Sequence, residues 1–161
     1  MIIIELFQPS EFEVIRSFVE SIQEYERKQI PELKQGEEIG FDYTQMLIDM
    51  TAKHQGCILV ARADSTAIGF VCAWIDEDDD LLLHDDARKH AYVSDIFVSE
   101  TWRQQGVASL LLQAVENEMQ KQGCKRSRIC TKASNLAALK CYEGNGYSAY
   151  EIILSKLLID R

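Results

Sequence analysis

The sequence lacks several features that would assign the protein to other classes. Its 161 residues contain no run of about 18 consecutive apolar residues, the length that a membrane-spanning helix needs. The opening Met1–Glu5 has neither the charge nor the length of a secretory signal. Basic residues number 17 against 26 acidic ones, and the formal charge of −9 has the wrong sign for neutralising phosphates. We therefore expect a cytoplasmic protein that binds neither a membrane nor nucleic acid.

Paired cysteines and metal-binding patterns are also missing. The five cysteines are an odd number, and no two of them form a Cys-x-x-Cys pair, so we expect reduced, mostly buried thiols. His84 and His90 lie beside carboxylates, but no third ligand has the spacing of a metal site, and we expect no metal. The cysteines are Cys57, Cys72, Cys124, Cys130 and Cys141.

The common nucleotide-binding motifs are absent as well. There is no Gly-x-x-x-x-Gly-Lys-Ser/Thr sequence, and no Gly-x-Gly-x-x-Gly followed by an acidic residue about 20 positions later. These absences disfavour an ATP site and an NAD site.

What is present is the pattern of one α/β domain over residues 1–161. The hydrophobic content of 47% suffices for a single core. Hairpin strands come first and a strand–helix–strand crossover comes later, which predicts a mixed sheet with helices on both faces. Expected strands are 2–7, 57–63, 67–75, 92–98, 127–131 and 147–158; expected helices are 10–30, 43–50, 107–122 and 136–143.

The first expected helix carries its own boundary signals. The Ser10-x-x-Glu13 spacing is typical of a capping box, and Pro31 is expected to end the helix. One face is apolar, whereas Glu20, Glu24 and Glu26 are expected to point away from the core. The apolar face consists of Ile15, Phe18, Val19, Ile22 and Tyr25.

The segment Arg103–Ala108 carries the clearest chemical signal. It lies where a strand turns directly into a helix, and it has small residues at Gly106 and Ala108, so a ligand can approach the backbone closely. Free amides at a helix N-terminus, with the positive end of the helix dipole, bind phosphate oxygens without a basic side chain. A pyrophosphate is the ligand that this turn predicts.

These residues resemble the signature of the GNAT N-acetyltransferases, Arg/Gln-x-x-Gly-x-Gly/Ala after a valine-ending strand. A second segment, Asn135–Tyr147, resembles the family pattern Asn-x-x-Ala-x-x-x-Tyr-x-x-x-Gly-Phe. The strand Asp95–Val98 is nearest in motif to the diamine (spermidine/spermine) acetyltransferase group. The chain departs from the family in having Gln104 where glycine is frequent and Tyr147 where phenylalanine is usual. The resemblance covers about residues 92–147 and implies a central mixed sheet with a splayed strand pair for coenzyme A.

The resemblance also implies which residues bind acetyl-coenzyme A. Main-chain groups of Ile96 and Val98 would pair with the pantetheine, and an amide near Phe97 would polarise the thioester carbonyl. Arg103 either reaches the pyrophosphate or braces the turn. The remaining cofactor-binding candidates are Gln104, Gln105, Gly106, Val107, Ala108 and Ser109 at the pyrophosphate, and Asn135 and Tyr142 at the thioester.

Two residues are the catalytic candidates. Asp95 would accept a proton from the ammonium, directly or through water, because only a neutral amine attacks a thioester; its other interpretation is substrate positioning or the capping of a strand bulge. Tyr142 would give a proton to the leaving thiolate, although a packing role in the core is its other interpretation. Cys141 has no adjacent histidine, so an acyl-enzyme on this thiol is disfavoured.

The acceptor is expected to be a small cationic amine, such as a polyamine or an aminoglycoside. The segment 76–86 carries seven carboxylates and would attract a polycation, although a solvated acidic loop explains it as well. Trp74 and Asp76 are substrate-binding candidates, and Tyr43 and Trp102 are further residues that either line the pocket or simply pack. The alternatives are acetylation of a protein, peptide or amino acid, and a non-catalytic acyl-coenzyme A sensor. A homodimer is a further expectation that the family resemblance implies, and the apolar C-terminal segment 152–159 suits either a dimer interface or the centre of the sheet.

Overall fold

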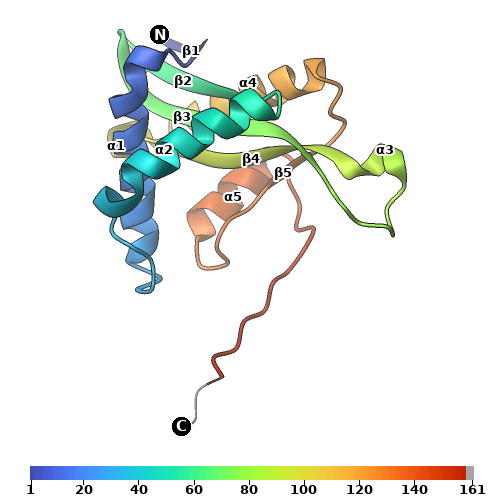
Figure 1. Ribbon diagram of the computed structural model, residues 1–161. Helices are drawn as coiled ribbons and strands as arrows, with labels where there is room; N and C mark the ends of the chain where they lie inside the picture. The colour runs from blue at the N-terminus through green and yellow to red at the C-terminus, as the bar shows by residue number, and fades with distance from the viewer. Residues whose placement is uncertain (159–161) are drawn as a thin grey trace.

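The computed structural model describes residues 1–158, and its centre is a five-stranded mixed sheet in the order β1-β2-β3-β4-β5 (Figure 1). The first four strands pair antiparallel in sequence order, and β5 runs parallel to β4. This arrangement confirms the mixed sheet that the order of elements predicts. The strands are β1 (Ile2–Leu6), β2 (Cys57–Ala63), β3 (Thr66–Glu77), β4 (Lys89–Val98) and β5 (Ser127–Ile129).

Helices cover both faces of the sheet, each over its own apolar cluster. On one face α1 (Phe12–Arg27) and α2 (Gly36–Lys53) bury Ile15 and Leu47 against Phe70. On the other face α4 (Val107–Lys121) buries Leu111 and Val115 against the sheet. Side chains alternate between the faces of a strand, so β2 and β3 contribute to both clusters. The shorter helices are η1 (Pro9–Glu11), α3 (Asp85–Arg88), η2 (Glu100–Trp102) and α5 (Leu136–Gly144).

The second helix begins earlier than its apolar spacing predicts, and two glycines explain why. Gly36 and Gly40 lie inside α2, although local composition predicts a connection there. A Cβ at Gly36 would stand 2.6 Å from the carbonyl oxygen of Glu20, and one at Gly40 would meet the Glu20 side chain. The glycines therefore allow α2 to pack closely on α1, a gain that local helix propensity cannot show.

The start of α1 and its end also differ from the expectation. The predicted Ser10-x-x-Glu13 capping box does not form; instead the N–H of Gln8 donates to the Glu11 carboxylate at 2.8 Å and begins the short η1. The helix ends at Arg27, before Pro31, which lies in the connection to α2. Proline disfavours helical conformation in the residue before it, so the helix ends upstream.

The C-terminal segment contains no strand within the described residues, so the strand predicted at 147–158 is wrong. Ile152, Ile153 and Leu154 are at least 81% exposed, and the segment extends away from the sheet (Figure 1). A β-strand is stabilised by pairing with a neighbour, and β-prone composition alone does not supply one. Ile159, the last residue of the predicted apolar segment, lies outside the described residues.

Two irregularities in β4 determine the geometry of the functional region. Against β3, Cys72 pairs with Asp95 and Ala73 with Val93, so Ser94 is an extra residue, a β-bulge. Against β5, the pairing covers only Ala91–Val93. The five residues from Ser94 to Val98 therefore have no strand partner on the β5 side, and the two parallel strands are splayed there.

Candidate active site

The splay presents main-chain groups of β4 that the sheet does not use. The N–H of Ser99 donates to the carbonyl of Ile68 at 2.8 Å, and antiparallel strands alternate the direction of their main-chain groups. The main-chain groups of Phe97 thus point toward β3, whereas those of Ile96 and Val98 point into the splay. This edge can accept an extended ligand as an added strand.

The turn after β4 places a second set of unpaired amides beside this edge. No side chain caps the N-terminus of α4, and the first N–H groups of a helix have no partner within the helix itself. Gly106 immediately precedes the helix with φ +81°, and nothing lies within 4 Å of a Cβ built on it. A hollow of about 520 Å³ opens at this turn, and Gln105, Gly106 and Ser109 are among its lining residues. The predicted pyrophosphate turn is thus open to a ligand.

Arg103 braces the turn in this structure. Its Nε donates to the carbonyl oxygen of Val98 at 3.1 Å, and its guanidinium carbon lies 5.8 Å from the centre of the Tyr25 ring. Gln104 next to it adopts φ +60°, the left-handed conformation that glycine takes without strain. Gln104, which stands where the family frequently has glycine, therefore adopts the conformation of this turn at the cost of backbone strain.

Asp95 lies at the bulge, on the α1–α2 side of the sheet, and its carboxylate accepts hydrogen bonds from two hydroxyl groups. Ser94 Oγ donates to Asp95 Oδ2 at 2.5 Å, and the Tyr43 hydroxyl donates to the same oxygen at 3.2 Å. Burial and the negative charge of Glu26 raise the pKa of Asp95, whereas the two hydrogen bonds lower it. Burial is the largest effect, so the pKa of Asp95 lies above its ordinary value. Asp95 is therefore a stronger base than an exposed carboxylate. Tyr43, for which the sequence leaves pocket lining and packing open, contacts the catalytic candidate directly.

Tyr142 approaches the same centre from α5. Burial raises the pKa of its phenol, and the neighbouring Cys141, Asp95 and Glu26 raise it further. Asp95 and Tyr142 are thus close enough to interact electrostatically, although 47 positions separate them in the sequence. A phenol with a raised pKa stays protonated in neutral solution and keeps a proton to donate.

The other predicted residues near α5 have structural contacts of their own. The Asn135 side chain accepts a hydrogen bond from the N–H of Ala138 at 3.1 Å and caps the helix. Burial raises the pKa of the Cys141 thiol, which disfavours the nucleophilic thiolate. The Tyr147 hydroxyl donates to Glu116 at 2.6 Å and lies 2.9 Å from Ser127 Oγ.

Trp74 and Asp76 lie on β3, which pairs with the strand that carries Asp95. Trp74 is 7% exposed, and its ring packs 5.4 Å from that of Tyr92 in the core beneath α2. Asp76 pairs with His90, five residues before Asp95, which corresponds to about 17 Å along a strand. The acidic segment 76–86 therefore projects with the far end of the β3–β4 hairpin (Figure 1).

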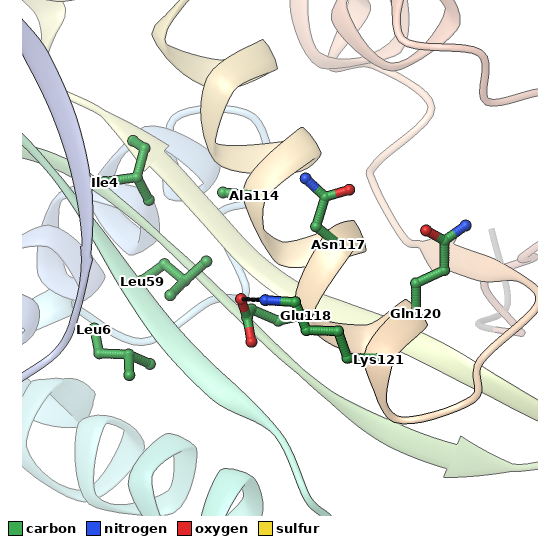
Figure 2. A pocket seen from close by; sticks show the side chains of 8 residues that line it. All are labelled: Ile4, Leu6, Leu59, Ala114, Asn117, Glu118, Gln120 and Lys121. Carbon is green, nitrogen blue, oxygen red and sulfur yellow. Dashed lines mark hydrogen bonds and ion pairs between the residues drawn. The ribbon is translucent and has the colours of Figure 1, made fainter.

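A second hollow lies away from this centre. A hollow of about 800 Å³ lies between β1, β2 and α4, where Lys121 Nζ and Glu118 Oε1 are 2.6 Å apart (Figure 2). It is separated from Asp95 by the width of the sheet, since β2 and β3 lie between β1 and β4. Within residues 1–158, no group of three metal-ligating side chains comes together, and no helix is long and apolar enough to cross a membrane.

Residues 16–147 match the acetyltransferase (GNAT) family, and the chain belongs to that family. N-alpha-acetyltransferase 30 of Saccharomyces cerevisiae is 33% identical over 64 residues, which are 40% of this chain and 36% of that protein. The aminoglycoside N(6')-acetyltransferase type 1 of Salmonella typhimurium is 30% identical over 95 residues, or 59% of this chain and 64% of that protein. The chain thus matches less than two thirds of the length of either relative.

Solved structures confirm the fold over nearly the whole chain. The aminoglycoside acetyltransferase AAC(6')-Iy, in complex with a bisubstrate analog, superimposes with a TM-score of 0.73 at 21% identity and covers 99% of both chains. A putative acetyl transferase from Pyrococcus furiosus gives a TM-score of 0.74 at 24% identity and covers 98% of this chain and 100% of its own. The mixed sheet with helices on both faces is therefore the GNAT fold.

Proposed function

We propose that this protein transfers the acetyl group of acetyl-coenzyme A to a primary amine in a ternary complex, with residues 1–161 acting as one acetyltransferase domain. The observation that carries the proposal is the splay of β4 from β5 directly beside the uncapped N-terminus of α4. An extended amide chain fits the first feature and a pyrophosphate fits the second, and coenzyme A contains both in one molecule. Family membership supports the same conclusion.

The cofactor is held mainly by the backbone in this proposal. Ile96 and Val98 offer main-chain groups to the pantetheine, and the amides from Gln104 to Ser109 hold the pyrophosphate. The Ile96 amide replaces Phe97 as the group that polarises the thioester carbonyl, because the main chain of Phe97 points toward β3. When bound, acetyl-coenzyme A supplies the activated acetyl group.

Asp95 and Tyr142 act as the base and the acid in this proposal. Asp95 receives a proton from the acceptor ammonium, directly or through water, and the neutral nitrogen forms a bond to the carbonyl carbon as the carbon–sulfur bond breaks. Tyr142 gives its proton to the departing sulfur, and the second proton of the attacking nitrogen, released as the amide forms, returns to the Tyr142 oxygen. The raised pKa of Asp95 favours the first transfer, and the protonated phenol permits the second.

The acceptor class is a small cationic amine. Asp95 lies beside the hydroxyl groups of Ser94 and Tyr43, and the negative charge of Glu26 acts on it. These groups together suit an ammonium group. The Salmonella relative is named an aminoglycoside N(6')-acetyltransferase and the yeast relative an N-alpha-acetyltransferase, so aminoglycosides and α-amines both belong in the test. The second function, a silent acyl-coenzyme A sensor, predicts cofactor binding without turnover.

A coenzyme A release assay separates these functions. Purified protein with acetyl-coenzyme A is presented with polyamines, aminoglycosides, amino acids and N-terminal peptides, and products are identified by mass spectrometry. We expect acetylated product from at least one small cationic amine. Tight cofactor binding with no acetylated product from any amine would favour the sensor and contradict the proposal.

We propose also that the protein works in the cytoplasm as a homodimer. All five cysteines are free thiols, as a reducing compartment favours. Leu157 and Leu158, like Ile152–Leu154, are at least 75% exposed, and contact with a second copy would bury them. Light scattering on the purified protein should give twice the chain mass, and the mass of one chain would contradict the dimer.

A further inference from the structure

Asp95 follows directly after Ser94, the extra residue of the bulge in β4. In a regular strand, consecutive side chains point to opposite faces of the sheet, so the residue before Asp95 would be directed away from its carboxylate. At the bulge, the Ser94 hydroxyl instead lies 2.5 Å from Asp95 Oδ2. A bulge commonly re-aims a side chain beside a functional site. The irregularity of β4 therefore brings a neighbouring hydroxyl to the proposed base.

The two hydroxyl groups around Asp95 differ in how they contact its two oxygens. The Tyr43 hydroxyl lies 3.2 Å from Oδ2 and 3.4 Å from Oδ1, so it barely distinguishes them. Within residues 1–158, Ser94 donates to Oδ2 and to no other oxygen of this carboxylate. A short hydrogen bond to an ionised acceptor is among the strong ones. Ser94 thus makes the two oxygens unequal, and Oδ1 keeps the more available lone pairs.

The buried Cys72 thiol does not compete for the Ser94 proton. Cys72 is fully buried and pairs with Asp95 across β3 and β4. Burial raises the pKa of this thiol well above its ordinary value, Asp95 raises it further, and Ser94 lowers it. The sulfur therefore stays protonated, and a protonated sulfur is a weak acceptor. The single hydroxyl proton of Ser94 goes to the carboxylate.

We infer that Ser94 is a positioning residue, whose hydroxyl holds Asp95 Oδ2 and leaves Oδ1 as the oxygen that receives the proton of the acceptor ammonium. The inference rests on the proposed acetyl transfer and names the atom at which the proton arrives. When the proton leaves nitrogen and bonds to Oδ1, Oδ2 keeps its lone pairs. Asp95 can therefore gain and lose a proton without losing the hydrogen bonds that orient it.

The test removes the oxygen of Ser94 and measures acetyl transfer to spermidine and to kanamycin, one polyamine and one aminoglycoside. In Ser94→Ala the remaining Tyr43 hydroxyl leaves the carboxylate free to rotate. The value of kcat should fall about tenfold, the factor that one charge-assisted hydrogen bond gives, while the Kd for acetyl-coenzyme A stays within about twofold. Ser94→Thr keeps the hydroxyl and should retain kcat within about threefold.

The pH profile separates positioning from a change in ionisation alone. The Ser94 hydroxyl favours the ionised carboxylate, so its removal should raise the pKa of Asp95 further. Activity is present above that pKa and lost below it, so the acid limb should begin at a higher pH in Ser94→Ala. A stronger base by itself would leave the plateau above the limb equal or higher. A moved limb with an unlowered plateau would overturn the inference.

Ser99→Ala is the matched control. Ser99 directly follows the same strand, is half-buried like Ser94, and its side chain makes no capping hydrogen bond. This substitution should leave both the plateau and the acid limb unchanged. An equal fall of kcat in Ser99→Ala and Ser94→Ala would show a general disturbance of β4 and would overturn the inference. A tenfold fall in Ser94→Thr would do so as well.

The ionisation of Asp95 can be measured without turnover, which keeps this inference separate from the proposed function. Carbon NMR of protein labelled at the aspartate carboxyl carbons follows the titration, and Asp95→Asn identifies the signal. The carboxyl of Ser94→Ala should titrate at a higher pH than that of the wild type. This shift with no acetylated product from any amine would contradict the acetyl transfer alone. Acetylated product with an unchanged titration and plateau in Ser94→Ala would contradict the role of Ser94 alone.

Discussion

Replacing Gln104 with glycine should stabilise the protein, although the change removes a whole side chain. Gln104 has φ +60°, and its side chain makes no hydrogen bond to any other residue of 1–158. The left-handed conformation costs a residue with a Cβ about 1–2 kcal/mol. Glycine avoids this strain but loses about 0.5–1 kcal/mol more conformational entropy on folding. The difference predicts a net stabilisation of about 0.5–1 kcal/mol for Gln104→Gly.

The assay is urea unfolding followed by circular dichroism. The gain of about 0.5–1 kcal/mol is expected in the free energy of unfolding. A thermal scan should show it as a rise of about 1–4 °C in melting temperature for a chain of this size. Gln104→Ala is the control, because alanine removes the same polar group and keeps the Cβ, so its stability should equal that of the wild type. Coenzyme A affinity should survive in both variants, since each retains the amide at position 104. If Gln104→Gly is no more stable than Gln104→Ala, the strain attributed to this turn is absent.

Two further substitutions remove single hydroxyl groups. Tyr43→Phe removes a donor that favours the ionised form of Asp95, so the pKa of this carboxyl should rise further; activity, which is present above that pKa and lost below it, should then begin to fall at a higher pH. The kcat/KM–pH profile checks this, and an unmoved acid limb would contradict it. Tyr147→Phe should cost about 1 kcal/mol in urea unfolding because it deprives Glu116 and Ser127 of their shared partner, and wild-type stability would contradict that role.

The sequence predicted the parts of the fold that depend on local pattern. Alternating spacing located the hairpin, and Gly106 located the turn between β4 and α4. The early start of α2 could not be predicted, because Gly36 and Gly40 look like helix breakers until the backbone and side chain of Glu20 are seen against them. The C-terminal strand was wrongly predicted, because β-prone residues form a strand only beside a partner strand, and composition does not reveal whether one is available.

Residues of the proposed site could be named from the sequence where a motif contains them. Asp95 and Tyr142 belong to the two segments that resemble the family, and the structure brings them within electrostatic reach of each other. Tyr43 comes from a helix without a motif, and only the packing of α2 against the sheet brings its hydroxyl to Asp95.

The most direct test of the proposed chemistry is the effect of Tyr142→Phe on turnover and on cofactor affinity, measured together. Loss of a general acid should lower kcat by about a hundredfold or more, while the Kd for acetyl-coenzyme A stays within about threefold. Tyr147→Phe provides the control, since it removes a hydroxyl from a ring centred 6.1 Å from that of Tyr142 and should leave kcat nearly unchanged. An unchanged kcat in Tyr142→Phe, or a loss explained entirely by weaker cofactor binding, would contradict the role of Tyr142 as the acid.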